Sequence, residues 1–457
     1  MFGVGSRHLS FAVISAIAIT FPAAAPVGAE ASKVVVFNDD GAWSWFEDER
    51  AIIAGGRLIV GSVASGRLDP ERRGDIEVVS YELTTGEKVL FELHDRLEYD
   101  DHNSPALLQR PDGRILAVYA KHGTENHFYY RLSAEADDAS GWGRERVFVP
   151  SESSRITYSN LHLLSGENGG RGRIYNFYRG LDDSYKPSYA YSDDGGEKWK
   201  SGNIVIDVPA DQRHRPYVKY ASNGRDTLHL FYTEGHPNVF DNSAYHIYYS
   251  RATFFRSDGT SINGLTSGLR NPAEGTRIFQ GDADSVAWVS DIHLDRVGRP
   301  YVAYSVQKDS GGLPRFQGGD DLRYRYARWN GNGWEDHEIA YAGTRLYAGE
   351  DDYTGNIALD PNNPDIVYIS TNVDPRSGRA LKSSADGIRH YEIFRGETSD
   401  RGRTWRWTAL TENSGQDNIR PIVPIRSSGV GAVLWLRGTY AAYTDYKLEV
   451  VGIILPK

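Results

Sequence analysis

From Lys33 to the C-terminus, short segments of the chain alternate apolar and polar residues and end at Asp, Asn or Gly. Examples are residues 57–63 (RLIVGSV), 76–81 (IEVVSY) and 227–232 (TLHLFY). A period of two gives a strand one buried face and one solvent face, and long stretches with the 3.6-residue period of a helix are missing. Many short strands separated by turn residues predict an all-β sandwich, barrel or propeller.

Two internal repeats favour the propeller among these folds. Residues 192–199 (SDDGGEKW) and 398–405 (TSDRGRTW) share the form [ST]-x-D-x-G-x-x-W, known as an Asp box. In this hairpin turn the Asp side chain caps backbone N–H groups, Gly accepts a positive φ, and Trp fills the gap between strands. Degenerate versions occur at 111–114, 295–299 and 330–334. The motif predicts propeller blades and carries no catalytic information.

The chain length sets the number of blades. At about 40–60 residues per blade, this sequence fits seven blades better than eight. The ring must close, because an open ring would expose unpaired strand edges. We therefore expect a strand near residues 33–37 to complete a blade built from residues 447–455. No low-complexity linker interrupts the run, so residues 30–457 are predicted to form a single β-propeller catalytic domain.

The first 29 residues have the features of a secretory signal peptide. Arg7 and His8 precede an apolar run at 9–21, which is too short for a membrane span. Small residues at 27–29 favour cleavage after Ala29, whereas cleavage after Ala25 would leave a proline behind the scissile bond. We expect a soluble protein that is secreted or periplasmic.

Composition narrows the classes of partner. The chain has 29 Tyr, 10 Trp and 48 Gly but no Cys, which excludes a disulfide framework and a thiolate metal site. A formal net charge of −10 argues against nucleic acid as a ligand. It does not argue against an anionic substrate, because local arginines can reverse the field inside a cleft. We expect a monomer with no membrane partner.

Polar residues at the ends of predicted strands are the candidates for chemistry. His102 and His122 lead this set, since histidine is the side chain most easily tuned to exchange protons near neutral pH. Arg179 ends the apolar strand 174–178 at a position where no structural role requires a guanidinium. Tyr158 is either a site residue or one of many packing tyrosines. Further candidates are Asn103, Arg215, Tyr217, His236 and Arg420, of which Arg215 and Arg420 could equally form structural salt bridges.

The same segments carry a family resemblance that extends over nearly the whole mature chain. They are residues 43–46 (WSWF), the segments that contain His102 and His122, 157–160 (TYSN), 178–180 (YRG), 192–199, 359–364 (LDPNNP), 418–421 (NIRP) and 435–440 (WLRGTY). In these motifs the chain resembles the BNR-4 group of secreted seven-bladed propellers. That group contains the ulvan lyases of polysaccharide lyase families 24 and 25, and a related group cleaves rhamnosyl-glucuronate linkages. The twenty-residue step between the two histidines is the most specific element.

The resemblance implies four active-site residues. The two histidines of those lyases fall on His102 and His122, their tyrosine on Tyr158 and their arginine on Arg179. One difference is the loop 165–172, which is several residues longer than the family pattern. A hairpin insertion there would leave both Tyr158 and Arg179 in place.

The implied reaction is β-elimination in a uronate-containing polysaccharide, with ulvan as the favoured substrate. Removing the C5 proton requires the neighbouring carboxylate to be neutralised, which suits Arg179 and His102 with help from Asn103. Tyr158 and His122 are the candidates for taking the C5 proton and for protonating the leaving O4, in an order that the sequence leaves open. Asn103, Arg215, Tyr217 and Arg420 are predicted to bind the substrate.

This chemistry requires no cofactor. A structural divalent metal ion, Ca²⁺ or Zn²⁺, is compatible with the sequence. His236, His246, Asp291 and His293 are potential ligands, although their spacing matches no diagnostic metal motif.

Three alternatives stay open at this point. A sialidase-like glycoside hydrolase also carries Asp boxes, but Arg50 poorly matches its N-terminal arginine motif and the paired histidines would have no role. A hydrolase with two catalytic carboxylates has many candidates among 61 acidic residues. A non-catalytic glycan-binding propeller would keep aromatic residues and arginines without needing the histidines.

Overall fold

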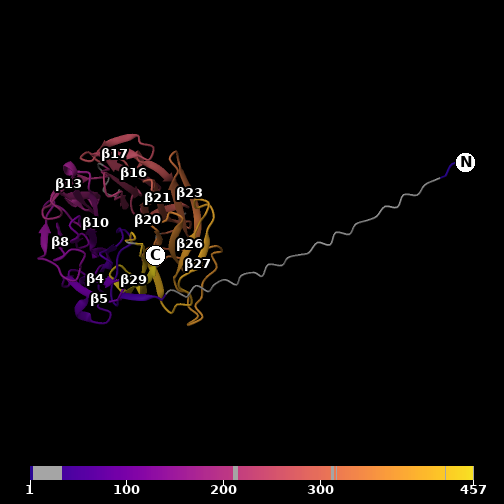
Figure 1. The fold of residues 1–457 in the computed structure, drawn as a ribbon, viewed down its shortest axis with the longest axis horizontal. Coiled ribbons are helices and arrows are strands. Elements are labelled where there is room, and N and C mark those ends of the chain that lie inside the picture. Colours follow the sequence, from indigo (N-terminus) through magenta and orange to yellow (C-terminus); the bar gives the residue numbers. More distant parts are fainter. Residues whose placement is uncertain (4–32, 209–214, 310–312, 315, 428, 456–457) are drawn as a thin grey trace. The chain divides into compact units, whose positions relative to one another are not determined.

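The computed structural model describes residues 1–3, 33–208, 215–309, 313–314, 316–427 and 429–455. In this part of the chain the strands form seven antiparallel sheets, which follow one another around a ring in sequence order (Figure 1). Helical structure in the described residues is limited to 3-10 turns of three residues each. The predicted seven-bladed β-propeller is therefore confirmed. No helix of the described chain is long and apolar enough to cross a membrane.

The blades have the following strands. Blade 1 has β2 (Ala51–Ala54), β3 (Arg57–Val63), β4 (Ile76–Glu82) and β5 (Lys88–His94); blade 2 has β6 (Ala106–Gln109), β7 (Ile115–Tyr119), β8 (Phe128–Leu132) and β9 (Arg146–Phe148); blade 3 has β10 (Thr157–Leu164), β11 (Arg173–Arg179), β12 (Pro187–Ser192) and β13 (Lys200–Ile204). Blade 4 has β14 (Val218–Ser222), β15 (Thr227–Tyr232), β16 (Ala244–Ser250), β17 (Thr253–Arg256), β18 (Ser261–Gly264) and β19 (Thr276–Phe279); blade 5 has β20 (Val286–Leu294), β21 (Pro300–Gln307), β22 (Leu322–Trp329) and β23 (Trp334–Gly343). Blade 6 has β24 (Ile357–Leu359), β25 (Ile366–Thr371), β26 (Glu392–Glu397) and β27 (Arg406–Ala409); blade 7 has β28 (Asp417–Ile422), β29 (Gly431–Ala442), β30 (Asp445–Leu455) and β1 (Val35–Asn38).

The two ends of the described propeller meet in blade 7. Strand β1 pairs antiparallel with β30, with Val35 opposite Gly452, which confirms the predicted ring closure. Apolar side chains of blade 7 pack against those of blade 1 in one core cluster that includes Phe37, Leu58 and Val450. Closure thus removes an exposed strand edge and buries apolar surface at the same seam.

The first strand of most blades lies nearest the ring axis. Strands β6, β10, β14, β20, β24 and β28 contact one another from blade to blade, and β10 and β20 lie near the ring centre in Figure 1, whereas β13 and β23 lie at its rim. All blades run in the same sense, so the segments that lead into the first strands gather at one end of the axis. The residues before β6, at the start of β10 and after β11 therefore lie at the same end of the ring axis.

Both Asp boxes lie at the opposite end and join neighbouring blades. In the first, Asp194 accepts a hydrogen bond from the backbone N–H of Lys198 at 2.9 Å. Its Trp199 packs on Phe128 of blade 2, with the ring centroids 5.3 Å apart. The second box repeats this arrangement, because its Trp405 lies edge-on to Tyr326 of blade 5 at 5.4 Å. The tryptophans thus fill gaps between blades.

The predicted signal peptide and its cleavage after Ala29 lie outside the described residues. They stay a prediction. The propeller itself, from Val34 onward, forms one compact unit.

Replacing Trp199 with alanine should destabilise the propeller without changing its chemistry. Trp199 is 6% exposed, and removing a buried aromatic ring of this size costs about 3–5 kcal/mol. Chemical denaturation should show that loss, whereas Lys198→Ala at the exposed neighbouring position should change the free energy of unfolding little. A stable Trp199→Ala protein would contradict the structural role of the Asp box.

Candidate active site

The first predicted histidine lies in a capped 3-10 turn just before β6. The turn spans Asp101–Asn103, and the side chain of Asp100 caps it by accepting the backbone N–H of His102 at 3.0 Å. Asp100, Asp101, His102 and Asn103 are all at most 4% exposed. The local sequence therefore buries two carboxylates around one imidazole.

Asp100 also holds the second histidine. Its Oδ1 atom accepts a hydrogen bond from Nδ1 of His102 at 2.6 Å, and its Oδ2 atom accepts one from Nδ1 of His122 at 2.8 Å. The two imidazole rings stack with centroids 4.0 Å apart and planes 16° from parallel. Glu98 fixes the backbone of the second residue by accepting the N–H of His122 at 2.8 Å. The structure thus brings the two predicted histidines together on one carboxylate.

The two histidines differ in their electrostatic surroundings. Burial opposes a charge on His102, but Asp100 and Asp101 outweigh it and raise its pKa to about 10. Burial and the neighbouring charge of His102 lower the pKa of His122 below its ordinary value. Burial raises the pKa of Asp100, but the two imidazoles outweigh burial and hold this pKa far below the usual range of a carboxyl. At neutral pH the site therefore contains an imidazolium, a neutral imidazole and a carboxylate.

Arg420 lies beneath this pair. Its guanidinium donates to Asp101 Oδ2 and to the carbonyl of Trp43, both at 2.6 Å, and it stacks on the ring of Tyr440 at 4.3 Å. The hydroxyl of Tyr440 donates to the same Asp101 oxygen at 2.9 Å. Arg420 is only 1% exposed, so in this arrangement its charge neutralises Asp101 inside the protein.

Tyr158 and Arg179 come from the adjacent ends of β10 and β11. Arg179 lies opposite Thr157 in the strand register, with the long loop at the other end of the hairpin, so the loop insertion displaces neither residue. Tyr158 has a φ of 62° at a bulge in β10, a conformation that non-glycine residues rarely adopt and that marks a re-aimed side chain. Gly180 follows Arg179 with a φ of 105°, and a Cβ there would meet the carbonyl of Arg155.

The four residues form one cluster. The ring of Tyr158 lies 5.4 Å from that of His102 and 6.2 Å from that of His122, between centroids. The guanidinium of Arg179 lies 5.6 Å from the Tyr158 ring and 4.4 Å from that of Tyr217. Burial raises the pKa of Tyr158 well above its ordinary value, although Arg179 acts in the opposite direction. The phenol therefore keeps its proton at neutral pH.

The remaining sequence candidates divide into two groups. Tyr217 lies under Arg179, and the guanidinium of Arg215 lies 5.0 Å from the ring of Tyr185, beside the cluster. Asn103 is fully buried and donates to Glu98, and Arg420 is buried on Asp101. The structure buries these last two on carboxylates, where they support the histidine turn.

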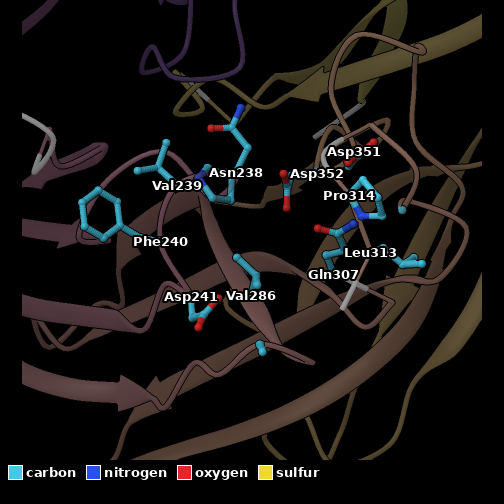
Figure 2. Close-up of a pocket in the computed structure, with 13 residues that line it drawn as sticks. Asn238, Val239, Phe240, Asp241, Val286, Gln307, Leu313, Pro314, Asp351 and Asp352 are labelled. Carbon is cyan, nitrogen blue, oxygen red and sulfur yellow. The ribbon is translucent and has the colours of Figure 1, made fainter. Parts of the chain in front are cut away.

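The residues that directly follow His236 in the sequence line a cavity of about 260 Å³. The ring of His236 lies 5.8 Å from that of Tyr217. Figure 2 shows Asn238 and Val239 on one side of the cavity, Gln307 and Leu313 on the other, and Asp352 between them. Among the described residues its lining also includes Asp241 and Asp351, of which Asp351 is ion-paired with Arg345 at 2.9 Å.

Sequence reasoning missed two residues of the cluster. Asp100 was not among the predicted site residues, although Asp is a favoured capping residue at the start of a turn. Nor was Tyr443, which lies in the β29–β30 hairpin, 37% exposed and edge-on to both His102 and His122 at 5.2 and 5.5 Å. Nothing in the local sequence indicated that contact.

The potential metal ligands do not gather in one place. Asp291 and His293 lie together with Glu49, whereas His246 pairs with His229 in blade 4 and His236 contacts Trp288 of blade 5. Both Asp291 oxygens accept backbone N–H groups, and the charges of His293 and Lys219 lower the pKa of Glu49 against its burial. Because His293 already lies 3.4 Å from an oxygen of each carboxylate and burial raises the pKa of Asp291 to about 7, these residues fit a buried ion-pair network better than a divalent metal site.

The comparison with protein families agrees with this architecture. The model of the BNR repeat-containing family matches residues 44–342, about two thirds of the chain. The chain belongs to this family. No curated protein sequence matches this BNR repeat protein.

Solved structures with the same fold include two polysaccharide lyases. A PL25 ulvan lyase bound to -[GlcA(1-4)Rha3S]- has 15% identity and a TM-score of 0.64, over 92% of this chain and 95% of the other. The polysaccharide lyase Uly1 has 12% identity and a TM-score of 0.57, over 95% and 94% of the two chains. At these identities the likeness of this BNR repeat protein to the two lyases establishes the shared fold.

Removing the buried cation below the histidines should destabilise the protein strongly. Arg420→Met removes the shorter of the two ion pairs of the buried Asp101 and leaves only His102 at 3.0 Å, and breaking a buried pair in this way typically costs about 3–5 kcal/mol. The double variant Asp101→Asn/Arg420→Met removes both charges and should recover part of that loss in chemical denaturation. Purely additive losses in the double variant would contradict the coupling of the two charges.

Proposed function

We propose that this protein is a polysaccharide lyase that cleaves an anionic, uronate-containing glycan by β-elimination at the C4–O4 bond. The observation that carries the proposal is the cluster of His102, His122, Tyr158 and Arg179, with both imidazoles hydrogen-bonded to one carboxylate. Elimination needs a cationic site for the uronate carboxylate, a base for the C5 proton and an acid for the leaving O4. The cluster offers a residue for each role.

In this proposal His102 and Arg179 neutralise the substrate carboxylate. The His102 ring and the guanidinium of Arg179 both lie close to the Tyr158 ring, at 5.4 and 5.6 Å from its centroid. Positive charge at this position stabilises the enolate-like intermediate that forms when C5 loses its proton. Arg215 and Tyr217 extend the binding surface next to Arg179, while Asn103 and Arg420 act by supporting the histidine turn.

The protonation states favour His122 as the base and Tyr158 as the acid. His122 has a lowered pKa and a 28% exposed side chain, so it is neutral and accessible to the substrate at pH 7. Tyr158 has a raised pKa and keeps a proton to give to the departing O4. General acid–base steps of this kind contribute about 10²–10⁴-fold each.

The proposed substrate is ulvan, a sulfated polymer of rhamnose and uronic acids. The shared fold with an ulvan lyase bound to a glucuronate–rhamnose-3-sulfate repeat supports this choice, and another rhamnosyl-glucuronate glycan is the second candidate. We further propose that the protein acts as a secreted or periplasmic monomer. No cofactor enters the proposed steps.

A glycoside hydrolase is the main alternative, and the carboxylates beside the histidines argue against it. A hydrolase of that kind needs two accessible carboxyl groups flanking the glycosidic bond. Asp100 and Asp101 are at most 5% exposed in their side chains and already hydrogen-bonded or ion-paired. Arg50, the candidate for a sialidase-like arginine motif, is buried on Glu47 at 2.9 Å.

Ultraviolet absorbance near 235 nm tests the proposal, because elimination creates a conjugated C4=C5 uronate and hydrolysis does not. The purified protein should raise the absorbance on ulvan more than on polygalacturonate or gum arabic. New reducing ends without absorbance would instead identify a hydrolase. No reaction on any glycan would favour a binding propeller.

Substitutions in the cluster should separate catalysis from folding. His122→Ala and Tyr158→Phe should each lower kcat by at least about 10²-fold, because each removes a proton-transfer group. Arg179→Ala should reduce kcat at least as clearly as it weakens binding, since it acts on the intermediate. Initial rates at 235 nm and melting temperatures measure both effects; wild-type turnover in either proton-transfer variant would remove that residue from the mechanism.

The pH profile of kcat/KM should have a broad plateau. The pKa of His122 lies below 6.5, so its base form is present at neutral pH and is lost only as the pH falls through that lowered value. The pKa of His102 is about 10, so its charge is present at neutral pH and is lost as the pH rises through about 10. Rates measured from acid to alkaline pH should therefore fall on both sides. A sharp optimum near pH 5 would contradict these assignments.

A further inference from the structure

We propose that Asp100 is a positioning residue that holds the two stacked histidines in unequal protonation states. In this arrangement His102 is the permanent cation and His122 is a neutral imidazole whose hydrogen sits on Nδ1. The consequence for catalysis rests on the proposed lyase function, whereas the arrangement itself does not. Asp100 touches no substrate in this proposal and acts only through the two rings.

The geometry fixes where the ring hydrogens lie. An ionised carboxylate can only accept hydrogen bonds, and each oxygen of Asp100 lies within 2.8 Å of one Nδ1 atom. Both Nδ1 atoms must therefore carry a hydrogen. A neutral His122 then has its lone pair on Nε2, which is the form a base requires. Carboxylates that set an imidazole tautomer in this way are a recurrent device in proton-transfer sites.

The packing allows only one of the two rings to be charged. Two imidazolium rings with centroids 4.0 Å apart would repel each other in a buried site. His102 is the favoured cation because it has a second carboxylate, Asp101, with an oxygen 3.0 Å from its Nδ1, and its side chain is 4% exposed. The ring nitrogens of His122 contact only Asp100 among the described carboxylates, and its side chain is 28% exposed.

Charged and titratable groups on the surrounding elements also lie near the pair. Those that face the pair are Glu47 and Arg50 before β2, Glu98 and Asp101 before β6, Tyr158 of β10, Arg179 of β11, Arg420 of β28, and Tyr440 and Tyr443 of the β29–β30 hairpin. Arg50 neutralises Glu47, and Arg420 neutralises Asp101. Asp100 is thus the carboxylate shared by both rings, and the raised pKa of His102 beside the lowered pKa of His122 agrees with this division.

Nuclear magnetic resonance of ¹⁵N-histidine-labelled protein tests the proposal without any substrate. Long-range ¹H–¹⁵N spectra recorded against pH report the protonation and tautomer of each ring, and His102→Gln and His122→Gln assign the two signals. In the wild type, His102 should stay doubly protonated to about pH 9 and His122 should be a neutral Nδ1–H tautomer at pH 7. Equal titration of the two rings, or two neutral rings, would overturn the proposal.

The Asp100→Asn variant provides a second test of the positioning role. Asparagine can still cap the turn, but its amide accepts from one ring and donates to the other. One histidine should therefore change to the Nε2–H tautomer, and the midpoint for His102 should fall by at least about one pH unit. Asp386→Asn is the matched control, because Asp386 pairs with His390 at 2.8 Å on blade 6 and should affect only that histidine. Unchanged states of His102 and His122 in Asp100→Asn would refute the role; if that variant does not fold, the wild-type spectrum still decides.

Activity links the inference to the proposed function. If the wild type eliminates, Asp100→Asn should lower kcat by at least about tenfold with a smaller change in KM, and should shift the acid limb of the pH profile. A folded Asp100→Asn protein with wild-type kcat and an unshifted profile would contradict the positioning role. If the wild type does not eliminate, the lyase proposal fails while the spectra still test Asp100.

Discussion

The candidate site depends on one buried carboxylate shared by two stacked imidazoles. Asp100 caps the turn that carries His102, binds the ring of His102 and binds the ring of His122. Two imidazole rings 4.0 Å apart cannot both be charged at low cost. The two histidines that share this carboxylate therefore differ in protonation state. A cation and a neutral base side by side are what elimination from a uronate demands.

The propeller makes this arrangement stable by bringing distant segments to one end of its axis. Ring closure through β1 and β30 fixes the β29–β30 hairpin, whose Tyr440 contacts Asp101 and whose Tyr443 covers both histidines. Tyr158 and Arg420 each have a positive φ, 62° and 53°, in strands whose register shifts at that point. Such conformations cost about 1–3 kcal/mol each and persist where the surroundings enforce them. The bulges direct Tyr158 toward the two histidines and Arg420 toward the buried Asp101.

The sequence predicted the fold well because its signals are local. Alternating strands, two Asp boxes and a closing N-terminal strand each depend on neighbouring residues or on a simple topological rule. The family resemblance implied that His102, His122, Tyr158 and Arg179 share one site, and the structure brings them together because they lie at corresponding strand ends. The burial of Arg420 was not predictable, because its partner Asp101 lies 319 residues away in the sequence. An arginine can bind the carboxylate of a substrate or one inside the protein equally well. The position of Tyr443 and the grouping of Glu49 with Asp291 and His293 were not predictable either, because only the closed ring brings these residues together.

Mass spectrometry of the fragments released from ulvan tests the central claim most directly. Elimination breaks the C4–O4 bond without adding water, so the fragment with the new uronate end should be lighter by one water molecule than the hydrolysis product. The account predicts this dehydrated uronate at the new non-reducing end that each cleavage by the wild-type protein creates, and an ordinary reducing end on the other fragment. Fragments that carry a hydrated uronate or a hydrated rhamnose at that end would contradict it, and would show that the two histidines serve a different reaction.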